Sequence, residues 1–72
     1  MKEDAIFLYS RVIYSGASGV YEGVSLGDCG YVIEDYGGEY CEVEFYGAGG
    51  VTKAQVVINK RFLVVSDEKT EK

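Results

Sequence analysis

Cys29 and Cys41 are the residues of this chain with the most potential for metal, redox or nucleophilic chemistry. They do not form a C-x-x-C pair, and the chain has no histidine, so a zinc site would need carboxylates to complete it. In the strand pairing described below they lie about 17 Å apart, far beyond the roughly 7 Å over which a disulfide joins two Cα atoms. The sequence therefore predicts that both cysteines are free thiols that fill space in the core, and that the protein resides in a reducing compartment.

Neighbouring carboxylates are the second group that could do chemistry. Glu34 with Asp35, or Glu42 with Glu44, have the residue type of a glycosidase acid/base pair. That mechanism also needs a substrate cleft and a desolvated carboxyl group, for which 72 residues leave little room. The glycine-rich segments 16–19 and 47–50 lack the Lys-Ser/Thr of a phosphate-binding loop. We predict no catalytic residue, no metal site and no cofactor, so the protein is not expected to be an enzyme.

Composition limits the class of partner. A chain of 72 residues with 47% hydrophobic residues makes one small folded domain. The net charge of −5 argues against binding nucleic acid through its phosphates. No run of about 18 apolar residues predicts a membrane span, and no basic segment followed by an apolar stretch opens the chain. We expect a cytoplasmic protein that contacts neither nucleic acid nor membrane.

The spacing of glycines predicts strands. Ten glycines and no proline separate short segments rich in Val, Ile, Tyr and Phe, which are strand-forming residues, and no segment has helical periodicity. We predict an all-β fold with five strands at residues 6–14, 30–36, 39–46, 52–58 and 62–65. A long loop at 15–27 and a single helical turn at 59–61 complete it. This pattern indicates a small barrel over residues 1–65, followed by a mobile charged tail at 66–72.

The segment 30–46 is expected to form a hairpin. Gly37 and Gly38 fit a two-residue turn with positive φ at both positions, so that Tyr36 pairs with Glu39. Because side chains alternate along a strand, the core face takes Val32, Val43 and Phe45. The outward face then carries three cross-strand pairs: Tyr31 with Glu44, Ile33 with Glu42, and Asp35 with Tyr40. We predict that these six residues bind a partner, because arginine stacks on tyrosine rings and pairs with carboxylates.

Charge is segregated along the chain. Between Arg11 and Lys53 there is no basic residue, whereas that stretch holds seven acidic ones. Such asymmetry creates a negative field that steers a positively charged partner toward the domain.

The string G-D-C-G-Y-V-I-E-D-Y-G-G-E-Y-C-E-V-E-F resembles the small bacterial SH3-like barrels of uncharacterised function, whose pattern is roughly G-D-x-G-x-V-V-E-x-Y, a glycine turn, then Y-x-V-E-F. The matching residues are Gly27, Asp28, Gly30, Val32, Ile33, Glu34, Tyr36, Tyr40, Val43, Glu44 and Phe45. The resemblance covers about residues 9–65. Similar patterning occurs in the barrels of the nitrile hydratase β subunit and the photosystem I E subunit, and in ribosomal KOW domains, which differ in being basic. The resemblance implies a five-stranded SH3-like barrel without metal or catalytic residues, and some members look like antidotes encoded beside a toxin.

Two functions are therefore expected. The first is a small acidic inhibitor or immunity/antitoxin-type protein that covers a basic surface of a toxin or nucleic-acid enzyme. The alternative is an accessory SH3-like subunit that docks on a larger enzyme or electron-transfer complex through an apolar patch of Ile33 with Val57 or Val56. A polyproline-binding module fits less well because the chain has no tryptophan. A homodimer that hides Tyr31, Ile33 and Tyr40 stays open.

Overall fold

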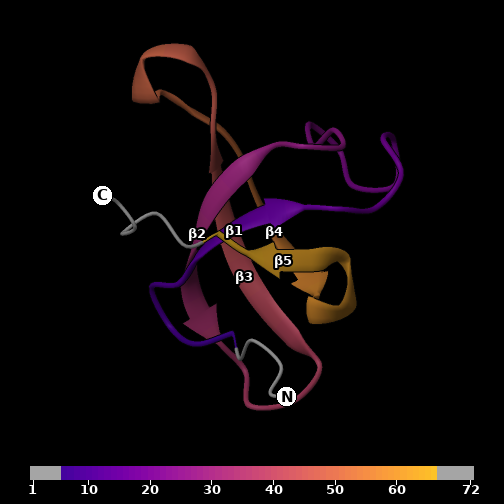
Figure 1. The fold of residues 1–72 in the computed structure, drawn as a ribbon, viewed down its shortest axis with the longest axis vertical. Coiled ribbons are helices and arrows are strands. Elements are labelled where there is room, and N and C mark those ends of the chain that lie inside the picture. The colour runs from indigo at the N-terminus through magenta and orange to yellow at the C-terminus, as the bar shows by residue number, and fades with distance from the viewer. Residues whose placement is uncertain (1–5, 67–72) are drawn as a thin grey trace.

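The fold is one antiparallel sheet, seen in the computed structural model of the chain, which describes residues 6–66 (Figure 1). Its five strands are β1 (Arg11–Tyr14), β2 (Cys29–Asp35), β3 (Tyr40–Tyr46), β4 (Thr52–Asn59) and β5 (Leu63–Val65). Two 3₁₀ turns, η1 (Ala48–Gly50) and η2 (Lys60–Phe62), separate the last strands. The predicted all-β fold of five strands is confirmed, with each of the last four strands within one residue of its expected bounds. No helix within residues 6–66 is long and apolar enough to cross a membrane.

The sheet is not a closed barrel. The strand order is β4-β3-β2-β1-β5, so β4 and β5 form its two edges, and no ladder joins them within residues 6–66. The chain passes from one edge to the other through η2, where the Asn59 side chain accepts the Arg61 backbone N–H at 2.9 Å. β5 is only three residues long and, among the described strands, pairs only with β1. The five predicted strands are therefore present, but the predicted closure is not.

The core lies on one face of this sheet. Its buried residues come from all five strands and from the long loop: Val12, Tyr14, Val24, Val32, Cys41, Val43, Phe45, Ile58 and Leu63. The three residues predicted for the core face of the hairpin are all fully buried. Tyr14 anchors the loop, because its hydroxyl donates to the Ala17 carbonyl at 2.8 Å and its ring meets that of Tyr21 edge-to-face at 6.0 Å. Burial raises the pKa of this phenol above its ordinary value.

The first strand begins later than predicted, at Arg11 rather than at residue 6. The preceding residues form a tight turn, in which Ser10 N–H donates to the Phe7 carbonyl and the Ser10 side chain accepts the Phe7 N–H, each at 2.9 Å. Tyr9 completes the turn with a φ of 69°. A serine that bonds nearby backbone groups offers the chain an alternative to a strand, which a run of apolar residues does not reveal.

The glycine turn of the hairpin also differs from the prediction. Gly37 has a φ of 84°, but Gly38 does not lie in the left-handed region. The Asp35 carboxylate accepts the Gly37 N–H at 2.9 Å, which is an Asx-type turn. The turn closes through Tyr36 N–H to the Tyr40 carbonyl at 3.3 Å, so the predicted pairing of Tyr36 with Glu39 is wrong.

A β-bulge at Ile33 shifts the hairpin register. Tyr31 pairs with Glu44 and Val32 with Val43, as predicted, but the next pairs are Glu34 with Glu42 and Asp35 with Cys41. Ile33 is the extra residue and has no cross-strand partner. The predicted pairs Ile33–Glu42 and Asp35–Tyr40 are therefore wrong, as is the placement of Cys41 opposite Glu34.

The predicted charged tail at 66–72 lies outside the described residues except for Ser66. Ser66 is held against β1, because its N–H donates to the Arg11 carbonyl at 2.8 Å and its hydroxyl accepts from Arg11 Nη1 at 2.6 Å.

Candidate functional site

The face of β2 and β3 that points away from the core carries tyrosines and glutamates. Every second residue of β3 is buried in the core, and the residues between them face outward. On β2, Tyr31 stands opposite Glu44, and Glu34 opposite Glu42. We call this set the acidic-tyrosine face; it consists of Tyr31, Glu34, Tyr40, Glu42, Glu44 and Tyr46.

Four of the six predicted partner-binding residues lie together on this face: Tyr31, Tyr40, Glu42 and Glu44. The two tyrosines are well exposed, at 40% for Tyr31 and 50% for Tyr40. The bulge separates the other two from them. Ile33 is half-buried, and Asp35 stands across the ladder from the buried Cys41, where it pairs with Lys60. The bulge instead places Glu34 on the face, a residue that the predicted register did not assign to it.

Neutral groups hold the two glutamates of β3. Glu42 accepts from the Tyr36 hydroxyl and from Gln55 Nε2, each at 3.0 Å, and Glu44 accepts from the Thr52 hydroxyl. Within residues 6–66 neither glutamate has an ion pair. Their orientation is therefore fixed, while no cation among residues 6–66 forms an ion pair with either carboxylate.

The phenols beside these glutamates respond to that charge. The pKa of Tyr36 lies above its ordinary value, chiefly because its hydroxyl bonds to Glu42, with burial and the charges of Glu42 and Glu34 adding to the effect. The pKa of Tyr46 is also raised, first by burial and then by Glu44 and Tyr31. The Tyr36 and Tyr46 hydroxyls therefore stay protonated at neutral pH.

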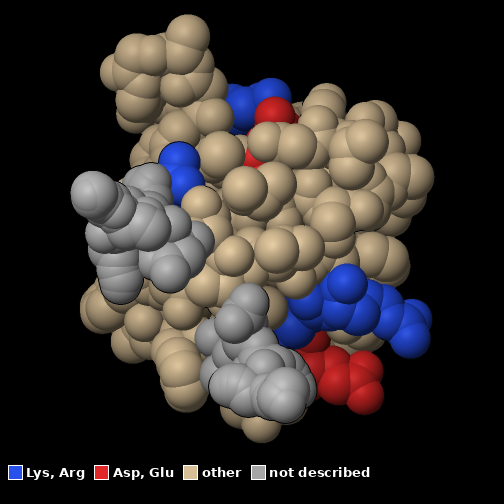
Figure 2. Space-filling model, viewed as in Figure 1, with Lys and Arg blue, Asp and Glu red and all other residues tan. Residues whose placement is uncertain are grey.

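Two aspartates elsewhere are neutralised by lysines. Lys53 lies 2.9 Å from Asp28, and Lys60 lies 2.9 Å from Asp35. On the side of the molecule shown in Figure 2, the acidic side chains likewise lie beside basic ones. The pKa of Asp35 is below its ordinary value, because Lys60 and the Gly37 N–H both bond to its carboxylate. For Asp28, burial is outweighed by the Ser25 N–H and Lys53, so its pKa is lowered as well.

The ion pair of Asp35 with Lys60 is expected to stabilise the fold at neutral pH and to lose its effect in acid. The folded pKa of Asp35 lies below the ordinary 3.8, so its stabilisation is complete above that value and disappears as the pH falls through the lowered pKa. Asp35→Asn should therefore lower the urea midpoint at about pH 7 but differ little from the wild type at about pH 2. Urea unfolding of both proteins at the two pH values checks this. A difference of the same size at both would contradict it.

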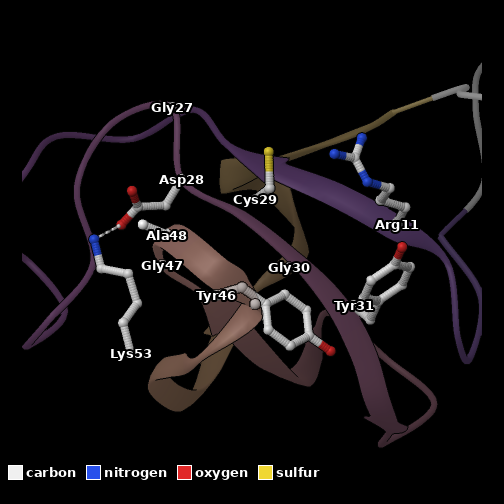
Figure 3. Close-up of a pocket in the computed structure, with 11 residues that line it drawn as sticks. Arg11, Gly27, Asp28, Cys29, Gly30, Tyr31, Tyr46, Gly47, Ala48 and Lys53 are labelled. Atoms are coloured by element: carbon white, nitrogen blue, oxygen red, sulfur yellow. Dashed lines mark ion pairs between the residues drawn. The ribbon is translucent and has the colours of Figure 1, made fainter.

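An open pocket of about 630 Å³ adjoins the face near Tyr31 and Tyr46 (Figure 3). Its basic lining residues are Arg11 at the start of β1 and Lys53 near the start of β4. Lys53 is the extra residue at a second register shift, where Phe45 pairs with Ala54 but Tyr46 pairs with Thr52. Sequence reasoning missed this pocket. Arg11 and Lys53 lie at the two ends of the acidic stretch, and no sequence pattern indicates that the fold brings them to one cavity.

Both cysteines are free thiols, as predicted, but they have different surroundings. Cys41 is fully buried in the core, and burial raises the pKa of its thiol. Cys29 is half-buried and lines the pocket rather than filling the core. The described residues contain no group of three or more His, Cys, Asp or Glu that could hold a metal ion.

No protein-family model, curated protein or solved structure matches this chain. The resemblance to small SH3-like barrels stays a prediction, and any function must be argued from the chain's own residues.

Proposed function

We propose that this protein is a small acidic, SH3-like binding module of the cytoplasm that covers a basic surface of another protein, as an inhibitor or an immunity/antitoxin-type protein does. The partner class is a toxin or a nucleic-acid enzyme. The observation that carries the proposal is the acidic-tyrosine face, where Glu42 and Glu44 have fixed orientations and no ion pair within residues 6–66. The five antiparallel strands support the SH3-like assignment.

The face matches the chemistry of arginine and lysine side chains. A guanidinium group stacks on an exposed tyrosine ring and donates two parallel hydrogen bonds to a carboxylate. Tyr31 stands directly opposite Glu44 across the β2–β3 ladder, so an exposed aromatic residue and an acidic residue are cross-strand neighbours on this face. Because Tyr36 and Gln55 already orient Glu42, little conformational freedom is lost when a partner binds.

The charge of the whole chain supports the same class of partner. A net charge of −5 on 72 residues attracts basic proteins over a distance of about one Debye length, roughly 8 Å at physiological salt. Enzymes that bind nucleic acid present lysine and arginine to phosphates. An acidic face that occupies those side chains would exclude the nucleic acid.

The alternative function, an accessory subunit that docks through apolar contacts, is favoured by Val57. This residue is 50% exposed and stands opposite Glu42 on β4. Ile33 is half-buried and adds less area to such a patch, and Val56 packs against the core instead. Salt distinguishes the two functions, because it weakens charge-driven association far more than apolar docking.

Capture of partners from the cells that make the protein tests the proposal. Tagged protein is incubated with lysate and washed at low or high salt, and the retained proteins are identified by mass spectrometry. We expect one basic protein, retained at low salt and lost at high salt. Retention of a large enzyme complex at high salt would favour the accessory subunit. Recovery of this chain alone would indicate a homo-oligomer and contradict the proposal.

A further inference from the structure

We propose that the pocket beside Tyr31 and Tyr46 binds a small aromatic anion, that is, a planar ring carrying a carboxylate or phosphate. The pocket shares Tyr31 and Tyr46 with the acidic-tyrosine face, but the proposal does not rest on the protein-binding function. The pocket's volume of about 630 Å³ is within the range of roughly 300–1,000 Å³ that is typical of small-molecule sites. Figure 3 shows the two tyrosine rings between Arg11 on one side and the Asp28–Lys53 ion pair on the other.

The aromatic half of the site is the pair of tyrosine rings. Tyr31 and Tyr46 meet edge-to-face, with centroids 5.6 Å apart and planes at 69°. Since Tyr31 is 40% exposed, a planar ligand can pack against it and extend the aromatic pair. The loop that follows β3 forms a wall with little side-chain bulk, made of Gly47, Ala48 and Gly50.

The charged half of the site is formed by Lys53 and Arg11. Four basic residues lie within residues 6–66, and two of them line this one pocket. In a protein with a net charge of −5, two basic side chains lining one pocket are not expected from composition alone. Against the one carboxylate of the lining, Asp28, these two cations give the lining residues a formal charge of +1, opposite in sign to the protein as a whole, which favours an anionic ligand.

Lys53 is positioned to donate to such a ligand. Its ammonium group lies 2.9 Å from Asp28, whose carboxylate is itself held by the Ser25 N–H at 2.7 Å. An ammonium group has three donors, so the bond to Asp28 leaves others for a ligand oxygen. Across the pocket, the bond from Arg11 Nη1 to Ser66 at 2.6 Å fixes the position of the guanidinium group.

Cys29 supplies a built-in reporter of occupancy. Its half-buried thiol lines the pocket, whereas Cys41, the other cysteine of the chain, is fully buried. A ligand seated against Tyr31 and Tyr46 would shield the Cys29 thiol from a small alkylating reagent. The thiol is not a reactant in this proposal.

The test measures the rate at which iodoacetamide alkylates Cys29 in the presence of phenyl phosphate or benzoate. At a ligand concentration about ten times its dissociation constant, alkylation should slow by about tenfold, because only the unoccupied fraction reacts. Benzyl alcohol, which has the ring without the charge, and inorganic phosphate, which has the charge without the ring, should protect much less. No protection by either aromatic anion, or equal protection by benzyl alcohol or by inorganic phosphate, would overturn the proposal.

Three variants separate binding from a structural effect, each first shown to be folded by its thermal unfolding. Lys53→Gln should raise the dissociation constant obtained from protection by about tenfold, the usual loss for one charge-assisted hydrogen bond. Lys60→Gln removes an ion pair of the same length outside the pocket and should leave protection unchanged. Asp28→Asn removes the competing carboxylate and should strengthen protection several-fold, which a merely structural role of the ion pair would not do. Unchanged protection in Lys53→Gln, or weaker protection in Asp28→Asn, would contradict the assignment.

Discussion

Replacing Gly30 with alanine is expected to destabilise the fold by about 3 kcal/mol or more, the upper range for overpacking a core. Gly30 is a buried residue of β2 that pairs with Phe45 of β3. A Cβ atom there would lie 2.5 Å from the Glu44 carbonyl oxygen and 2.8 Å from Val43 Cγ1. The carbonyl belongs to the backbone of the neighbouring strand, so it cannot move away without breaking the ladder. A loss of this size removes much of the roughly 4–11 kcal/mol that a domain of this length has.

Gly38→Ala is the matched control for this prediction. Gly38 lies in the hairpin turn, outside the left-handed region of φ, and a Cβ atom there would meet nothing within 4 Å. The midpoints of thermal and urea unfolding of Gly38→Ala should stay within error of those of the wild type. Those of Gly30→Ala should fall sharply or become unmeasurable. Equal stability of the two variants would show that β2 and β3 are not as close at Gly30 as the structure has them.

The part of the fold that could be predicted from the sequence is the part governed by alternation. On β3, buried and outward residues alternate without interruption from Tyr40 to Tyr46, so the core face and the outward glutamates follow from the pattern. The same rule failed on β2 beyond Val32. A bulge adds one residue to a strand, and the sequence Val32-Ile33-Glu34 reads equally well as a regular strand.

The bulge also explains which parts of the candidate site were predicted wrongly. Without it, Asp35 would share a face with Tyr40; with it, Asp35 stands opposite Cys41 and bonds to the Gly37 N–H and to Lys60. Glu34 takes the place next to Glu42 instead. Both Glu34 and Asp35 are acidic, so the face is acidic in either register. The type of surface was therefore predictable, but the residues that form it were not.

The pocket could not be predicted because it depends on tertiary structure. Arg11 and Lys53 belong to strands that do not pair with one another, since β2 and β3 lie between β1 and β4. Lys53 is directed there by the register shift between Phe45 and Tyr46, and its side chain is held by Asp28. A single sequence carries no local pattern that marks such a shift.

Reversing the charge of Glu42 and Glu44 together, as Glu42→Lys/Glu44→Lys, is expected to weaken association with the captured basic partner by at least about a hundredfold. Two attractive contacts become repulsive, and each close charge pair across an interface contributes about 1.5 kcal/mol or more. Both side chains are outward and without ion pairs within residues 6–66, so the fold should tolerate the change. A similar thermal midpoint for variant and wild type confirms that binding, not folding, is altered.

Glu22→Lys/Glu39→Lys is the control of equal charge. Glu22 lies in the long loop and Glu39 in the hairpin turn, both are exposed, and neither is part of the acidic-tyrosine face. The net charge changes by the same amount as in the first variant. A general attraction between an acidic and a basic protein would weaken equally in both variants, whereas a specific face would be affected in only one.

The dissociation constant of the captured partner, measured by calorimetry at physiological salt for the wild type and these two double variants, tests the central claim most directly. We predict that Glu42→Lys/Glu44→Lys loses binding by at least about a hundredfold, whereas Glu22→Lys/Glu39→Lys stays within about threefold of the wild type. Equal losses in the two variants, or undiminished binding by Glu42→Lys/Glu44→Lys, would contradict the assignment of the acidic-tyrosine face as the partner-binding surface.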